Sequence, residues 1–224
     1  AFNSDIQFWT FWPAMLLEIL VPIWAERARN TPWHPHHVAE RFGLFTLILL
    51  GESLLASANA VIDAGSEGEH VDGLIGLAAA GIVLAAGMWW MYFCREQGDR
   101  LGSLKNGLAF GYAHYFLFAA AGAVSAGIEV ELDLLTGAAE HLTVSTASLS
   151  LTIPVALFMF AIWVVLLRGK LRTGGSILFL ILTAGVLACA ALPVVTVVGT
   201  AVLVVAAVVV VERDRVLARD ASVR

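Results

Sequence analysis

The stretch HHVAERFGLFTLILLGES, residues 36–53, begins with charged and polar residues, which are followed by an apolar run and then by Glu52 and Ser53. The apolar run continues to residue 62, and a helix needs roughly 20 residues to cross the hydrocarbon of a membrane. Composition agrees, because 59% of the chain is hydrophobic, 14% is charged and the mean hydropathy is +0.84. These values lie far outside the usage of soluble domains. The sequence therefore predicts an integral membrane protein embedded in a lipid bilayer.

Seven apolar runs are candidates for membrane-spanning helices. They cover residues 8–26, 38–62, 73–94, 107–128, 147–167, 176–192 and 194–211. The last run is rich in β-branched valines, which favour strands in water, but a lone strand in lipid leaves its backbone unpaired, so we expect a helix. No linker divides the chain. Residues 1–224 are therefore expected to form one all-α polytopic bundle of about seven spans.

The loops between these runs separate by charge. One set carries Arg27 and Arg29, then Arg95, Arg100 and Lys105, then Arg168, Lys170 and Arg172, then Arg213, Arg215, Arg219 and Arg224. The alternate loops carry only acids, namely Asp63, Glu67, Glu69 and Asp72, and Glu129, Glu131, Asp133 and Glu140. Cytoplasmic loops hold the excess of Lys and Arg. This rule predicts a plasma (inner) membrane protein with residue 1 outside and the C-terminus in the cytoplasm. No basic run of the kind that binds nucleic acid is present.

Three polar residues of the second run and His37, just before it, fall on one stripe of a helix. We call His37, Arg41, Glu52 and Asn59 the polar seam. An acid at the centre of a spanning helix costs about 2.5 to 3.5 kcal/mol on the insertion scale. Glu52 therefore needs a partner, a proton or water. Besides the seam itself, the candidate intramembrane partners are Glu18 in the first run and His114 in the fourth.

Metal and enzyme chemistry find little support in the sequence. His34, His36 and His37 with Glu40 are metal-ligand residue types, but Pro35 holds the first two histidines in a loop, and contact with lipid head groups is the simpler interpretation. The chain has no GxSxG, HExxH or Walker-type glycine loop. We predict no catalytic residue, no metal and no cofactor.

The run Glu40-Arg41-Phe42-Gly43-Leu44-Phe45, followed by Leu50-Gly51-Glu52-Ser53, resembles the low temperature requirement A (LtrA) family of bacterial membrane proteins. The resemblance implies that Glu40, Arg41, Gly43, Gly51 and Glu52 are motif positions. It also implies a role in growth at low temperature, without an established substrate. The chain lacks the family's acidic and aromatic N-terminal motif and an initiator Met, so we expect the C-terminal portion of a longer protein.

A transporter-like or channel-like protein is the functional prediction, with the polar seam lining a cavity for a small solute, an ion or a proton. One alternative is a non-transporting membrane scaffold in cold or stress adaptation, in which the polar groups only tie helices together. Another is a membrane-embedded enzyme that modifies lipid with His36, His37 and Glu40. A cavity that reaches Glu52 favours transport, and a dry contact with Arg41 or His114 favours the scaffold.

Overall fold

A computed structural model describes residues 4–28, 34–67, 71–98, 101–138, 141–192 and 195–222, with the side chains of 4–8, 63–67 and 219–222 left out. The helices are α1 (Ser4–Ala28), α2 (Pro35–Glu67), α3 (Val71–Phe93), α4 (Leu104–Thr136), α5 (Val144–Ile162), α6 (Thr173–Cys189) and α7 (Thr196–Ser222). A π-helical turn, Trp163–Leu167, extends α5. The described residues contain no strand, and the all-α prediction is confirmed.

Five stretches are long and apolar enough to cross a membrane. They are Pro35–Ile62, Val71–Phe93, Leu104–Thr136, Val144–Leu167 and Thr196–Ala218. The helix α6 is apolar but has only 17 residues, and α1, which contains Pro13 and Pro22, is not among the five. The valine-rich run is helical, as the lack of backbone partners in lipid predicts.

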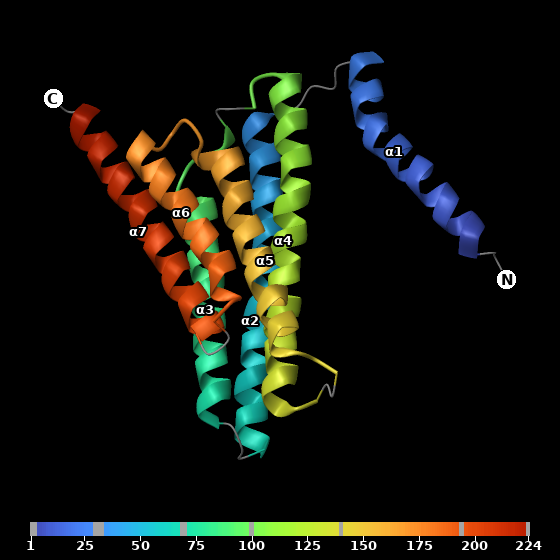
Figure 1. Cartoon of the computed structure of the whole chain (residues 1–224). Helices are drawn as coiled ribbons and strands as arrows, with labels where there is room; N and C mark the ends of the chain where they lie inside the picture. Colours follow the sequence, from blue (N-terminus) through green and yellow to red (C-terminus); the bar gives the residue numbers. More distant parts are fainter. Residues whose placement is uncertain are drawn as a thin grey trace.

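Helices α2 to α7 form an antiparallel bundle in which α4 packs between α2 and α5, and α7 packs on α3 and α6 (Figure 1). The fully buried core includes Leu74, Leu84, Met88, Leu117 and Phe158. Helix α1 leans away from the bundle (Figure 1) and touches it at α4, where the Tyr112 hydroxyl donates a hydrogen bond to the carbonyl of Ile19.

The two ends of the bundle differ in charge. Segment 94–98, the connection 168–172 and the end of α7 lie at the end where α2 begins, which we call the basic end (Figure 1). The end of α2 and the connection from α4 to α5 lie at the opposite, acidic end. The alternation predicted from loop charges therefore agrees with the chain path from α2 to α7. Arg29, Glu69, Arg100, Glu140 and Arg224 lie outside the described residues, as do the side chains of Asp63, Glu67 and Arg219.

Small residues and one tertiary cap fix how the helices meet. A Cβ on Gly127 of α4 would lie 2.6 Å from the carbonyl oxygen of Ser150 on α5, so only glycine allows this approach. At the basic end, the backbone N–H of Arg172, just before α6, donates to Oδ2 of Asp214 on α7 at 2.7 Å. A carboxylate is favourable at a helix N-terminus. Asp214 therefore ties α6 to α7.

Candidate functional site

The inward face of α2 is not the polar seam. Its buried residues are Gly43, Thr46, Leu50, Ser53, Ala56, Ser57 and Ala60. At ~100° per residue, the centre of this face lies about 120° from Glu52. Arg41 and Glu52 are exposed on the outer side of α2, and neither has a polar contact within the described part of the chain.

Residues with hydroxyl groups explain why this face of α2, and not the polar seam, turns toward the bundle. Thr46 donates to the carbonyl of Phe42 at 2.9 Å, and Ser57 donates to the carbonyl of Ser53 at 2.8 Å. Such residues satisfy much of their hydrogen bonding on their own helix and still allow close packing, whereas a carboxylate needs an external partner. Within this chain the seam therefore lies on the outer side of α2 at Arg41 and Glu52, and that it lines a cavity stays a prediction.

Two of the candidate partners of Glu52, His37 and Asn59, contact other residues in the structure. At the exposed start of α2, His37 Nδ1 lies 3.2 Å from Oε2 of Glu40. Near the acidic end, Asn59 is half-buried and donates to Oε1 of Glu129 on α4 at 3.3 Å. Neither contact involves Glu52.

Glu18 lines an open apolar groove of about 1040 Å³ between α1 and α4. Tyr112 and Tyr115 also line this groove, beside rings such as Phe11 and Phe116. No polar contact joins Glu18 to Glu52 among the described residues.

The two motif glycines have different surroundings. Gly43 is buried, and a Cβ there would lie 3.2 Å from Cε1 of Phe93, so it permits close contact between α2 and α3. Gly51 is exposed and nothing lies within 4 Å of a Cβ built on it. The packing of this chain therefore explains Gly43 and does not explain Gly51.

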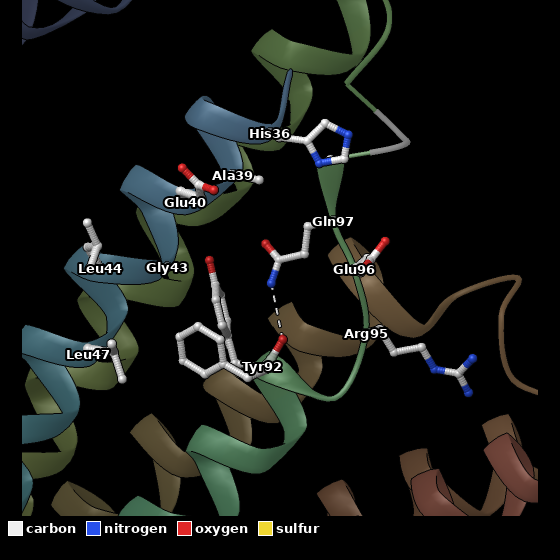
Figure 2. A pocket seen from close by; sticks show the side chains of 12 residues that line it. His36, Ala39, Glu40, Gly43, Leu44, Leu47, Tyr92, Arg95, Glu96 and Gln97 are labelled. Atoms are coloured by element: carbon white, nitrogen blue, oxygen red, sulfur yellow. Dashed lines mark hydrogen bonds between the residues drawn. The ribbon is translucent and has the colours of Figure 1, made fainter. Parts of the chain in front are cut away.

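A pocket of about 520 Å³ opens at the basic end between the first turns of α2 and the end of α3 (Figure 2). We call it the basic-end pocket. It is lined by His36, Ala39, Glu40, Gly43, Leu44 and Leu47 on α2, and by Tyr92, Phe93, Arg95, Glu96, Gln97 and Gly98. The family-like motif thus supplies one wall, and segment 94–98 supplies the other.

Segment 94–98 is held in place by hydrogen bonds. Gln97 Nε2 donates to the carbonyl of Tyr92 at 3.1 Å, the dashed line in Figure 2. Lys170 Nζ donates to the carbonyl of Glu96 at 3.0 Å. Gly98 lies directly under the ring of His36, since a Cβ there would be 2.5 Å from Nδ1 of that ring. These contacts give the pocket a defined wall.

Tyr92 and His114 form a fully buried pair beneath the pocket. The Tyr92 hydroxyl lies 3.0 Å from Nε2 of His114, and Nδ1 of His114 lies 2.7 Å from the carbonyl of Phe110. Phenylalanine rings surround the imidazole, with centroids at 4.0 Å for Phe110 and 4.8 Å for Phe42. A polar pair inside an aromatic shell is the arrangement that the sequence did not reveal.

The protons of this pair can be assigned from chemistry. A carbonyl oxygen only accepts, so Nδ1 of His114 carries a proton and donates it to Phe110. In the neutral imidazole, Nε2 then accepts, and the Tyr92 hydroxyl must donate to it. The Tyr92 oxygen is left with lone pairs only. Thr46 and Gln97 adjoin this hydroxyl.

Further polar groups lie on the inward faces of α2 and α4 toward the acidic end. Ser53 is fully buried and its hydroxyl has no partner among the described residues. Glu131 of α4 is 7% exposed, and its Oε1 likewise has none there. Within the described ranges, no group of three His, Cys, Asp or Glu side chains is placed to hold a metal ion.

The model of the family described as bacterial low temperature requirement A protein (LtrA) matches residues 1–211. The chain belongs to the LtrA family. No curated protein and no solved structure matches it. Together with the apolar helices, LtrA membership makes the chain a multi-pass integral membrane protein.

Of the LtrA-like motif positions, Glu40 and Gly43 line the basic-end pocket, while Arg41, Gly51 and Glu52 face outward. His114 was the one deep group that sequence reasoning selected. Its partner Tyr92 lies on another helix, α3. The spacing of residues within one helix cannot predict a contact between two helices.

Proposed function

We propose that this LtrA protein is a transporter-like or channel-like membrane protein in which the basic-end pocket admits a small polar solute or a proton. The observation that carries the proposal is the fully buried Tyr92–His114 pair at the floor of an open pocket. Ionisable groups inside a membrane are costly and mark pathways by default.

The scaffold alternative treats the same pair as a tie between α3 and α4. It predicts that removing the hydroxyl lowers stability and leaves no transport to lose. The lipid-modifying alternative relies on His36, His37 and Glu40, of which His37 and Glu40 are paired with each other at an exposed surface. The open pocket above a buried acid–base group favours transport over both.

The test is flux in proteoliposomes that contain the full chain and an internal pH dye. A potassium gradient with valinomycin supplies the driving potential, and proton entry is recorded with and without small solutes. We expect proton entry above that of empty liposomes, and at least a tenfold lower rate for Tyr92→Phe and for His114→Phe. Glu52→Gln is the control, because Glu52 lies outside this site. A rate that falls only in Glu52→Gln would return the pathway to the polar seam, and flux equal to that of empty liposomes for every solute would favour the scaffold.

We infer that the basic end faces the cytoplasm of the bacterial inner membrane, because cytoplasmic loops carry the excess of Lys and Arg. Gly102, just before α4, and His141, between α4 and α5, are both exposed. The start of α4 lies at the basic end, and the connection from α4 to α5 lies at the acidic end (Figure 1). In a background that lacks Cys94 and Cys189, an impermeant maleimide applied to intact cells should label His141→Cys and spare Gly102→Cys. The reverse pattern contradicts this orientation.

A further inference from the structure

We propose that the basic-end pocket binds a primary ammonium group, which donates hydrogen bonds to Gln97 Oε1 and the Tyr92 oxygen. The inference deepens the proposed function and uses the same pocket. It starts from the hydrogen-bond inventory of the lining. The protons of Tyr92, Thr46 and His114 Nδ1 are already committed inside the protein, so beside the Tyr92 hydroxyl a ligand meets oxygen lone pairs. Elsewhere in the lining, Nε and Nη2 of Arg95 are buried donors without a partner in the described part of the chain.

Two hydroxyl oxygens are acceptors only. The proton of Tyr92 goes to Nε2 of His114, and the proton of Thr46 goes to the carbonyl of Phe42 at 2.9 Å. Thr46 lies beside the Tyr92 hydroxyl. A ligand that approaches the Tyr92 oxygen must therefore bring a donor.

Gln97 supplies the decisive acceptor. Its side chain is only 9% exposed, and its Nε2 is fixed as the nitrogen because it donates to the carbonyl of Tyr92. Its Oε1 is buried and has no partner within the described part of the chain. A buried acceptor without a donor is unfavourable, and a ligand N–H would complete it. Figure 2 shows the Gln97 carboxamide projecting toward α2, between Glu40 and Tyr92.

Charge and ring placement favour a cation. The Glu40 carboxylate stands on the α2 side of the pocket, and it also accepts from His37 Nδ1. Arg95 is the fixed cation of the lining, and its guanidinium points away from Gln97 (Figure 2). The rings of Tyr92 and Phe93 line the pocket, and aromatic faces attract ammonium groups.

The size and apolar side of the pocket argue for an organic amine over a bare ion. A volume of about 520 Å³ exceeds the needs of one ion, and Leu44 and Leu47 extend the lining along the exposed side of α2. An ammonium head at Gln97 places its hydrocarbon part against these leucines. A soluble alkylamine and the ammonium of a phosphatidylethanolamine head group share this chemistry.

The experiment is calorimetric titration of the full detergent-purified chain with n-butylammonium chloride. We expect saturable binding, with none for sodium butyrate or sodium chloride at the same concentration. Gln97→Leu and Tyr92→Phe should each weaken binding at least tenfold, and Glu52→Gln should leave it unchanged. Gln97→Glu keeps an oxygen at Oε1 and adds a negative charge, although it removes the Nε2 donation to the Tyr92 carbonyl. It should bind the amine at least threefold more tightly, which gives a second test if Gln97→Leu does not fold.

Equal binding of butyrate, preferential binding of sodium, or unchanged amine affinity in both Gln97 variants would overturn the proposal. Nanodiscs separate the two sources of the ammonium. Weaker butylammonium binding in phosphatidylethanolamine discs than in phosphatidylcholine discs assigns the site to a lipid head group, and equal binding assigns it to a soluble amine. Binding without flux refutes transport and leaves the ligand class standing, whereas flux without amine binding refutes the ligand class alone.

Discussion

Replacing Tyr92 by phenylalanine removes one buried hydroxyl near the basic end of the bundle and leaves the ring in place. The ring keeps its contact with Phe93, whose centroid lies 4.8 Å away. What is lost is the hydrogen bond to His114, whose Nε2 then becomes an unpaired acceptor inside a shell of phenylalanines. Leaving a buried acceptor unsatisfied costs about 1–3 kcal/mol.

Membrane context sets the size of the effect. Hydrogen bonds between membrane helices average about 0.6 kcal/mol in double-mutant cycles, with a maximum near 1.7. The Tyr92–His114 bond belongs at the upper end, because both residues are fully buried and Nδ1 of the imidazole is already fixed on Phe110. We therefore expect a coupling free energy of about 1–2 kcal/mol between the two side chains.

The assay is the free energy of unfolding in mixed detergent micelles for the wild type, Tyr92→Phe, His114→Phe and the double variant. The double variant should cost less than the sum of the two single variants by the coupling energy. Strict additivity within about 0.3 kcal/mol would show that the two groups do not interact, and it would refute the hydrogen bond between them.

Three further substitutions test the packing. Asp214→Ala should lower the unfolding free energy by about 0.5–2 kcal/mol, because it removes the acceptor at the start of α6, and an unchanged value contradicts the tertiary cap. Gly127→Ala should cost about 1–3 kcal/mol through overlap with the backbone of Ser150, whereas the matched Gly122→Ala, with its nearest side-chain atom at 3.7 Å, should be nearly neutral; equal costs would contradict the predicted contact. Glu52→Leu should change detergent stability by less than about 0.5 kcal/mol, and a larger loss would reveal a partner for Glu52 within the chain.

The helices of the chain were predictable, because the length of an apolar run and the charge of the adjoining loops can be read for each segment without knowing how the helices pack. Composition predicted a membrane bundle, and the alternation of basic and acidic loops agrees with the direction of each helix from α2 to α7. The basic tail is the exception. The sequence predicts a loop after residue 211, yet α7 continues to Ser222. Within this extension, Nη1 of Arg215 lies 3.3 Å from Oε1 of Glu212, one turn earlier in the helix. Such pairs stabilise a helix locally.

The candidate site was predictable only in part, because it depends on helix phase and on contacts between helices. The charges at Arg41 and Glu52 suggested a seam that faces protein or water, whereas the buried face of α2 carries small and hydroxyl residues such as Gly43, Thr46 and Ser57. That small-residue pattern was present in the sequence and is the better guide to a tight membrane interface. The pairing of His114 with a tyrosine from α3 depends on how the two helices are aligned in the bundle. The sequence around either residue does not indicate it.

The proton pathway that we propose runs through the bundle interior, and one comparison tests this most directly. Proton entry into proteoliposomes is measured side by side for the wild type, Tyr92→Phe and Glu52→Gln, with equal protein reconstituted in each. We expect a rate at least tenfold lower for Tyr92→Phe and an unchanged rate for Glu52→Gln. Unchanged entry in Tyr92→Phe together with a lost rate in Glu52→Gln would contradict it.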